Sequence, residues 1–295
     1  MLSTFTSLAY WVNNLDPFVI HFPKGSFVDG IRWYGLAYVI SFLIAFALLH
    51  LYYQKKRSPY NPDQQTTLIT AIILGTLIGG RLGYMLLYDL HNFLHNPFLF
   101  FKVNEGGMAS HGGILGILIA LIWFARKTKT SLLALCDIIA SIAPLGAFFG
   151  RIANFINGEL WGKITYVKWA VIFPTSAPGF PLKLIPPRHP SQLYEAALEG
   201  LLLFIYIQFR FWTKGKTLPK GQLTGECFIG YAIARIICEF FRTPDAPLIL
   251  HINPGQFYSI FLIIAGLIFI FFSKKKHKSD HHSRTSCKLI KPENK

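Results

Sequence analysis

An arginine and a glutamate stand one helical turn apart inside an apolar stretch near the carboxyl end of the chain. Within GYAIARIICEFFRTPD, Tyr231, Arg235 and Glu239 recur every four residues, which places all three on one face of a helix. The arginine and the glutamate can simply neutralise each other. Alternatively, the carboxylate holds the guanidinium so that it points into a cavity, where its planar fork suits a phosphate.

A second polar group lies in GRIANFINGELWG, residues 150–162. Its polar side chains are Arg151, Asn154, Asn157 and Glu159. One interpretation is an interfacial helix cap and turn that ends at Gly158. The density of amide, guanidinium and carboxylate groups at membrane depth favours the other interpretation, a site for a lipid headgroup.

Two further motifs offer single candidates. GGMASHGGILG, residues 106–116, flanks His111 with glycines, which permit close approach of a ligand or another helix. His111 is either a hydrogen-bonding residue between helices or a general base, because an imidazole titrates near neutral pH. IRWYG places Tyr34 at the start of an apolar run, where it can be a site residue or an aromatic of the membrane interface.

The composition shows what kind of molecule must position these residues. Of the 295 residues, 52% are apolar and 15% are charged, and the mean hydropathy is +0.40. A soluble protein carries about 25% charged residues, so an ordinary soluble enzyme and a disordered chain are excluded. The net charge of +15 lies mostly in short loops between apolar runs, which indicates membrane topology and no nucleic-acid partner.

We therefore predict an all-α integral membrane protein with seven transmembrane helices. The expected spans are residues 33–53, 68–88, 108–125, 132–150, 196–212, 227–241 and 256–272. Lys and Arg gather after the first, third, fifth and seventh spans, which predicts an external amino terminus and a cytoplasmic carboxyl terminus. The four cysteines form no CxxC or metal-ligand spacing, so we expect no disulfide framework, no metal and no cofactor.

Outside the spans, three segments complete the expected organisation. Residues 151–195 form a small extracytoplasmic head, with a short strand at 167–173, and residues 1–30 form an interfacial amino-terminal segment. The membrane domain is expected to run over residues 1–273. The basic residues 274–295 are expected to be a disordered cytoplasmic tail that touches anionic lipid.

The motifs IRWYG, GGRLGY, GGMASHGG, GRIANFINGELWG, HPSQLYEA and YAIARIICEFFRTPD occur in this order. Over residues 17–273 the chain resembles the bacterial prolipoprotein diacylglyceryl transferase family. One departure is Ala153, which stands where the family usually has a second glycine. The change is expected to tighten the backbone and leave the chemistry in place.

The resemblance implies an enzyme of the bacterial cytoplasmic (inner) membrane. Such enzymes move the diacylglyceryl group of phosphatidylglycerol onto the thiol of the lipobox cysteine of a prolipoprotein. A thioether forms and glycerol 1-phosphate leaves, in the first step of lipoprotein maturation. By motif, the catalytic set is His111, Arg235 and Glu239, and Arg151, Asn154, Glu159 and Tyr34 bind phosphatidylglycerol.

Elementary chemistry agrees with these roles and leaves some questions open. A cysteine thiol has a pKa of about 8.5 and must lose its proton before it attacks carbon. His111 is the first choice for the base, followed by Glu239 or Tyr34. Two rival functions are a transporter of an anionic solute, which predicts half-repeats that the sequence lacks, and a non-enzymatic lipid-binding factor, which would tolerate loss of His111.

Overall fold

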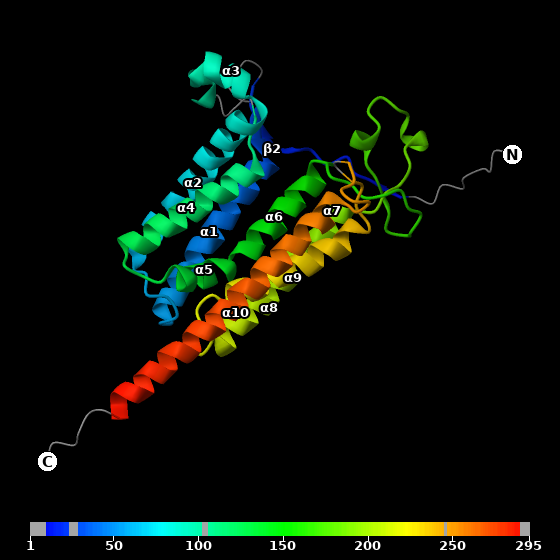
Figure 1. Ribbon diagram of the computed structural model, residues 1–295. Helices are drawn as coiled ribbons and strands as arrows, with labels where there is room; N and C mark the ends of the chain where they lie inside the picture. The colour runs from blue at the N-terminus through cyan, green and yellow to red at the C-terminus, as the bar shows by residue number, and fades with distance from the viewer. Residues whose placement is uncertain (1–9, 24–28, 102–105, 245–246, 290–295) are drawn as a thin grey trace. The chain divides into compact units, whose positions relative to one another are not determined.

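The structure is a computed structural model that describes residues 10–23, 29–101, 106–244 and 247–289, with only the backbone described for Ser110 and 276–289. Most of these residues are helical (Figure 1). The chain divides into two compact units, one formed by residues 1–43 and 140–295 and the other by residues 44–139. We call them the first and the second unit.

The helices follow the apolar runs of the sequence closely. They are α1 (Trp33–Gln54), α2 (Pro62–Tyr88), α3 (Leu90–His95), α4 (Ser110–Lys127), α5 (Leu132–Ala140), α6 (Ala143–Ile156), α7 (Ser191–Glu195), the π-helical segment η5 (Ala196–Leu202), α8 (Leu203–Lys214), α9 (Gln222–Glu239) and α10 (Pro254–Leu289). Short 3₁₀ turns are η1 (Pro97–Phe101), η3 (Pro174–Ser176) and η4 (Leu182–Leu184). Each expected span overlaps a helix or a continuous helical run.

In the second unit, α2 and α4 lie side by side (Figure 1). A capping box formed by Asn61 and Gln64 begins α2, and Pro62 occupies the first turn, where its missing N–H is not needed. Glycines line the contact between the two helices. A Cβ atom on Gly116 would clash with the backbone of Gly75, so the helices approach as closely as glycine permits.

In the first unit, α9 packs along α10, and α6 packs against α7 and η5. Close approach again depends on glycine, because a Cβ on Gly200 of η5 would meet the backbone of Phe148 on α6. The break between α5 and α6 has a specific cause. Pro144 stands in the first turn of α6 and cannot donate to a preceding carbonyl. The carbonyl of Ala140, which an N–H at position 144 would bond in a continuous helix, accepts from the thiol of Cys227 at 3.6 Å, and the Gln208 side chain donates to the carbonyl of Ser141 at 2.7 Å.

Short strands form in the described part of the amino-terminal segment that is expected at the interface. β2 (Phe18–His21) pairs antiparallel with β3 (Gly30–Arg32), and β1 (Trp11–Val12) pairs in parallel with β4 (Val171–Ile172). The described part of this segment is therefore extended, because its backbone groups find partners in neighbouring strands. Residues 1–9 and 24–28 of the expected interfacial segment lie outside the described residues. The strand expected at 167–173 is confirmed only at β4.

Two helices run past boundaries expected from the sequence. The head was expected to begin at Arg151, but α6 continues to Ile156 and ends where Gly158 adopts a left-handed conformation with a φ of +64°. The tail was expected to be disordered from residue 274, but α10 continues to Leu289. No proline or glycine occurs between 274 and 289 to stop a helix that is already formed. Residues 290–295 lie outside the described residues.

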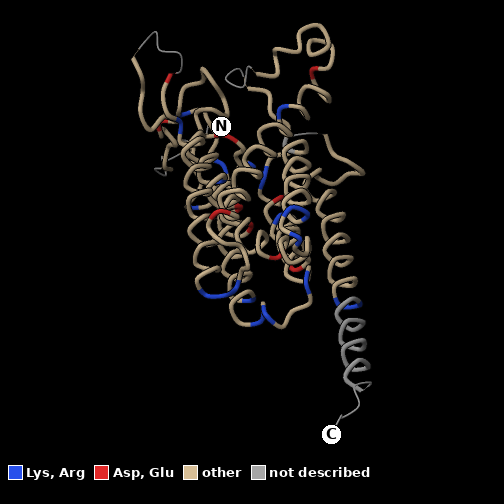
Figure 2. Tube along the Cα trace, turned by 90° about the vertical axis from the view of Figure 1, so that its left-hand side faces the viewer, with Lys and Arg blue, Asp and Glu red and all other residues tan. Residues whose placement is uncertain are grey.

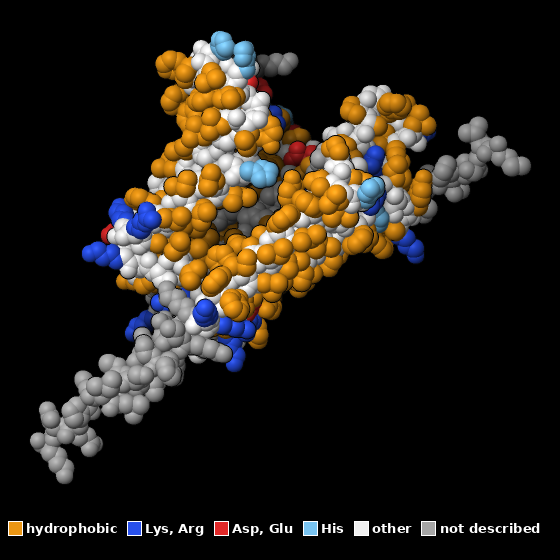
Figure 3. Space-filling model, in the orientation of Figure 1, with side chains coloured by type: hydrophobic (Ala, Val, Ile, Leu, Met, Phe, Trp, Pro, Cys, Tyr) orange, Lys and Arg blue, Asp and Glu red, His pale blue; other side chains and the backbone are white. Residues whose placement is uncertain are grey.

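The helices expose large apolar side chains. On α10, Phe261, Leu267 and Phe271 are exposed, and hydrophobic side chains cover much of the visible helical surface (Figure 3). By length and composition, four described helical stretches can cross a membrane. They are Trp33–Gln54, Pro62–Tyr88, Leu132–Ile156 and Pro254–Lys275. The molecule is therefore a mostly helical protein with the character of an integral membrane protein.

Candidate functional site

Three arginines and three glutamates form one cluster in the first unit. We call it the Arg–Glu cluster, and its members are Arg151 on α6, Glu195 on α7, Glu199 on η5, Arg235 and Glu239 on α9, and Arg242 just beyond α9. Figure 2 shows charged residues partway along the helices as well as in the loops at their ends. Buried charges of this kind must pair with one another, because an isolated charge inside a membrane protein is costly.

Glu195 lies at the centre of the cluster. Its Oε1 atom accepts hydrogen bonds from Nη1 of Arg235, at 2.6 Å, and from Nη1 of Arg242, at 2.8 Å. Its Oε2 atom lies 3.1 Å from Nε of Arg151. One carboxylate therefore pairs with three guanidinium groups from three parts of the chain.

The other two carboxylates have fewer or longer contacts. Glu199 lies 3.5 Å from Nη2 of Arg151 and 3.4 Å from Nη1 of Arg235. Glu239 lies 2.6 Å from Nη2 of Arg235, one turn away on the same helix. The Arg235–Glu239 pair predicted from the spacing of four is confirmed, and it belongs to a larger network.

Exposure separates the members of the cluster into two groups. The side chains of Arg151 and Arg235 are 18% and 15% exposed, whereas Glu195 and Glu199 are fully buried. Glu239 and Arg242 are each 4% exposed. The cluster holds three arginines and three glutamates, and Arg151 and Arg235 are its most exposed members. The chemistry that this arrangement offers is donation of charge-assisted hydrogen bonds to an anion.

Local backbone geometry brings the two buried glutamates to the cluster. Glu195 ends α7 and Glu199 lies four residues on, within the π-helical segment η5. A π-helical turn is wider than an α-helical turn and is frequently found at functional sites. The glutamates face α6, which packs against η5 and carries Arg151.

The polar block at the end of α6 and in the turn after it is held together by its own side chains. Asn154 donates to Oε1 of Glu159 at 2.7 Å, and Asn157 lies 3.5 Å from the same atom. The buried side chains of Ser191 and Gln192, on α7, donate to the backbone carbonyls of Leu160 and Glu159, respectively, and fix the turn to α7. These contacts join two motifs that lie far apart in the sequence.

Several aromatic side chains pack together, and two of them directly precede Glu195 and Arg242 in the sequence. The ring of His189 packs against Phe241, and its Nδ1 atom lies 3.1 Å from the hydroxyl of Tyr194. Trp169 donates to the same hydroxyl at 2.7 Å. Burial lowers the pKa of His189 below its ordinary value, and the positive charge of Lys163 lowers it further. His189 is therefore biased toward its neutral form.

The structure brings several of the predicted site residues together. Arg151, Arg235 and Glu239 share the cluster. Asn154 and Glu159 pair with each other. The sequence reasoning did not assign Glu195, Glu199 and Arg242 to the site, although the spacing of four between the two glutamates is the signal that identified Arg235 and Glu239.

Tyr34 and His111 lie in other parts of the chain. The Tyr34 ring contacts Tyr38, with 5.5 Å between centroids, and no hydrogen bond or ion pair among the described residues joins it to the Arg–Glu cluster. His111 lies in the first turn of α4, in the second unit, where it is exposed. Its role as a base stays a prediction.

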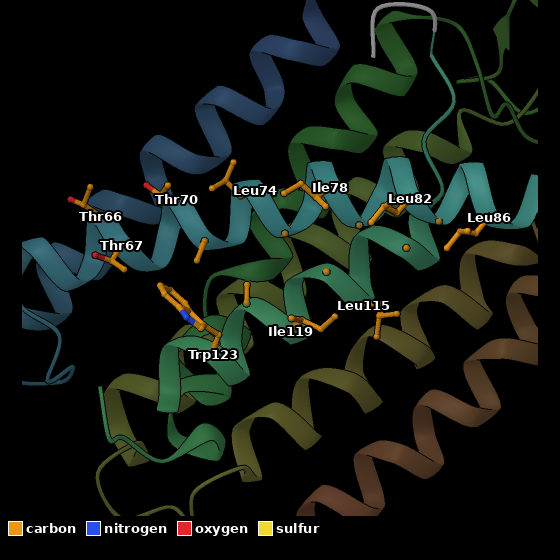
Figure 4. A pocket seen from close by; sticks show the side chains of 17 residues that line it. Thr66, Thr67, Thr70, Leu74, Ile78, Leu82, Leu86, Leu115, Ile119 and Trp123 are labelled. Carbon is orange, nitrogen blue, oxygen red and sulfur yellow. The ribbon is translucent and has the colours of Figure 1, made fainter. Parts of the chain in front are cut away.

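Next to His111, the second unit carries an apolar groove of about 800 Å³ (Figure 4). It lies along the line where α2 and α4 meet, and the glycines of that contact form part of its lining. Leu86 and Leu115 lie toward one end of the groove, and Thr66, Thr67 and Trp123 lie toward the other. Gly112, which follows His111, contributes to its lining. An apolar groove along apolar helices suits hydrocarbon chains.

The fold and the cluster together define a mostly helical protein of membrane-protein character that buries a network of guanidinium and carboxylate groups. The family model for prolipoprotein diacylglyceryl transferase matches residues 25–272, and the chain belongs to this family.

Named relatives agree with the family match. A protein of Proteus mirabilis (strain HI4320) named phosphatidylglycerol–prolipoprotein diacylglyceryl transferase is 43% identical over 274 residues, covering 87% of this chain and 92% of the relative. A protein of the same name from Idiomarina loihiensis is 44% identical over 250 residues, covering 83% and 90%. One from Shewanella sp. (strain ANA-3) is 39% identical over 265 residues, covering 87% and 95%.

Proposed function

We propose that this chain transfers the diacylglyceryl group of phosphatidylglycerol to the thiol of the lipobox cysteine of a prolipoprotein. The product is a thioether, and the leaving group is glycerol 1-phosphate. The family match and the names of the relatives support the substrates. The chain then catalyses the first step of lipoprotein maturation in the bacterial inner membrane.

One observation of the structure carries this proposal. Arg151 and Arg235 are the partly exposed members of a buried network, and both are held by carboxylates. The bond that breaks joins a glyceryl carbon to a phosphate oxygen, so negative charge grows on the phosphate as the bond lengthens. Preorganised guanidinium groups in a low-dielectric site stabilise that charge without rearrangement.

The remaining predicted residues take supporting roles. Asn154 and Glu159 shape the turn after α6 and, with Tyr34, line the site for phosphatidylglycerol. His111 takes the proton of the incoming thiol, and the resulting thiolate attacks carbon. Glu239 and Tyr34 are the next candidates for this base.

The proposal includes seven spans, an external head, an external amino terminus and a cytoplasmic carboxyl terminus. Beyond the four long apolar stretches, α4, α9 and the continuous run from α7 to α8 coincide with the remaining three expected spans. Basic loops lie together within each unit. Ser273 donates to the carbonyl of Lys220 at 2.8 Å, and the hydroxyls of Tyr60 and Thr130, beside two other basic loops, are 3.1 Å apart.

A direct test uses purified protein in detergent micelles with phosphatidylglycerol labelled in its terminal glycerol. The proposal predicts release of labelled glycerol phosphate only when a lipobox peptide with cysteine is present. The same peptide with serine in place of cysteine is the control. Absence of release with the cysteine peptide contradicts the proposed function.

A further inference from the structure

We propose that Glu195 is a positioning residue that aims Arg151 and Arg235 at the substrate phosphate. This inference rests on the proposed function, because it assigns the residue that prepares the arginines for that reaction. Glu195 itself is fully buried and does not need to touch the lipid.

The first argument is the number and length of its contacts. Glu195 pairs with both partly exposed arginines at 3.1 and 2.6 Å, using a different oxygen atom for each. Glu199 also reaches both arginines, but at 3.5 and 3.4 Å. Within the described parts of the chain, Glu239 forms an ion pair with Arg235 and with neither Arg151 nor Arg242. Of the three carboxylates, Glu195 therefore makes the shortest ion pairs that reach both guanidinium groups, with a hydrogen bond from Arg235 and an ion pair with Arg151.

The second argument is the way in which Glu195 is held. Arg242 lies just after α9 and is 4% exposed, and it donates a hydrogen bond to Glu195 at 2.8 Å. The helix that carries Glu195 is pinned at its start by Ser191 and Gln192, whose side chains bind the turn after α6. A carboxylate fixed from two sides can fix the rotamers of two long arginine side chains in turn.

The third argument is charge. Arg242 is almost fully buried beside Glu195. Its positive charge therefore stays with Glu195 when an anion binds to Arg151 and Arg235. Glu195 can therefore stay paired while the remaining N–H groups of Arg151 and Arg235, held in place, donate to a phosphate. Each arginine has five N–H donors in a fixed fork, so it can serve a carboxylate and a phosphate at the same time.

The test compares Glu195→Gln with Glu226→Gln in purified full-length protein. Glu226 is a matched control, because it lies on α9 in a bidentate ion pair with Arg210, at 2.8 and 2.6 Å, outside the Arg–Glu cluster. Glu195→Gln is expected to lower kcat/KM for phosphatidylglycerol about 10–100-fold. This is the size of loss seen in metalloenzymes when a residue that only orients a ligating side chain is replaced. The wild-type protein must release glycerol phosphate, so failure of the proposed function shows separately as inactive wild type.

A double-mutant cycle distinguishes positioning from a purely structural role. If Glu195 acts through the arginines, Glu195→Gln costs much less in an Arg151→Lys background than in the wild type. Equal losses in both backgrounds, or a loss no larger than that of Glu226→Gln, overturn the proposal. Should Glu195→Gln fail to insert, Glu195→Asp keeps the charge but cannot span its three partners, and near-wild-type activity of this variant overturns the proposal as well.

Discussion

Nη1 of Arg235 lies 2.6 Å from Oε1 of Glu195, although the two residues are 40 positions apart and lie on different helices. This ion pair joins α7 to α9 deep in the first unit. It also ties an arginine that is partly exposed to a carboxylate that is not. A ligand anion at Arg235 thus meets a side chain whose position is already set.

The first prediction concerns the shape of the Arg151 side chain. Arg151→Lys keeps the positive charge but loses the planar fork that contacts Glu195 and Glu199. We expect transfer activity to fall on the order of 10²-fold, with the protein still inserted. Arg210→Lys, which alters the ion pair with Glu226, is the control. Full activity of Arg151→Lys would mean that a positive potential alone suffices.

The second prediction concerns proton removal. His111→Gln keeps a polar side chain but cannot accept the proton at neutral pH, so the rate should fall on the order of 10²–10⁴-fold. The defect should shrink as the pH rises toward the thiol pKa of about 8.5, because the thiolate then forms without a base. Rates measured from pH 6 to 9 check this.

A flat pH profile for His111→Gln, or near-normal rates, would remove His111 as the base. Lipid binding should survive in this variant because the arginines remain. The search for the base would then turn to Glu239, which pairs with Arg235, and to Tyr34.

Much of the helical framework could be predicted from the sequence, because a long apolar run indicates a helix and the basic residues that follow it indicate where the helix ends. The one-face arrangement of Arg235 and Glu239 also followed from local spacing. The pairing of Glu195 with three arginines did not, since contacts between distant helices leave no local pattern. The sequence predicts that the fourth span ends at Gly150. In the structure α6 continues through Gly150 to Ile156 and therefore carries Arg151.

The third prediction concerns packing in the second unit. Gly116→Ala adds a Cβ that would clash with the Gly75 backbone on α2, and overpacking of this kind costs about 1–3 kcal/mol. We expect a lower thermal unfolding temperature in detergent. Gly146→Ala is the control, because its Cβ meets nothing within 4 Å and alanine favours a helix. An unchanged unfolding temperature for Gly116→Ala would show that the two helices can separate at no cost.

The fourth prediction concerns topology. A reporter fused after Ser273 should be cytoplasmic, and a reporter inserted near Ala177 should be external, because Lys and Arg are retained on the cytoplasmic side. Accessibility of the two reporters to a membrane-impermeant reagent checks both positions. An external signal after Ser273 would contradict the count of seven spans.

The most direct test of the account is the intact mass of a lipobox peptide after incubation with the purified protein and phosphatidylglycerol of a single acyl composition. The account predicts that the cysteine peptide gains the mass of one diacylglyceryl group for each glycerol phosphate released, and that the serine peptide gains none. Release of glycerol phosphate with no change in peptide mass would contradict it, because the chain would then cleave the lipid without transferring the diacylglyceryl group.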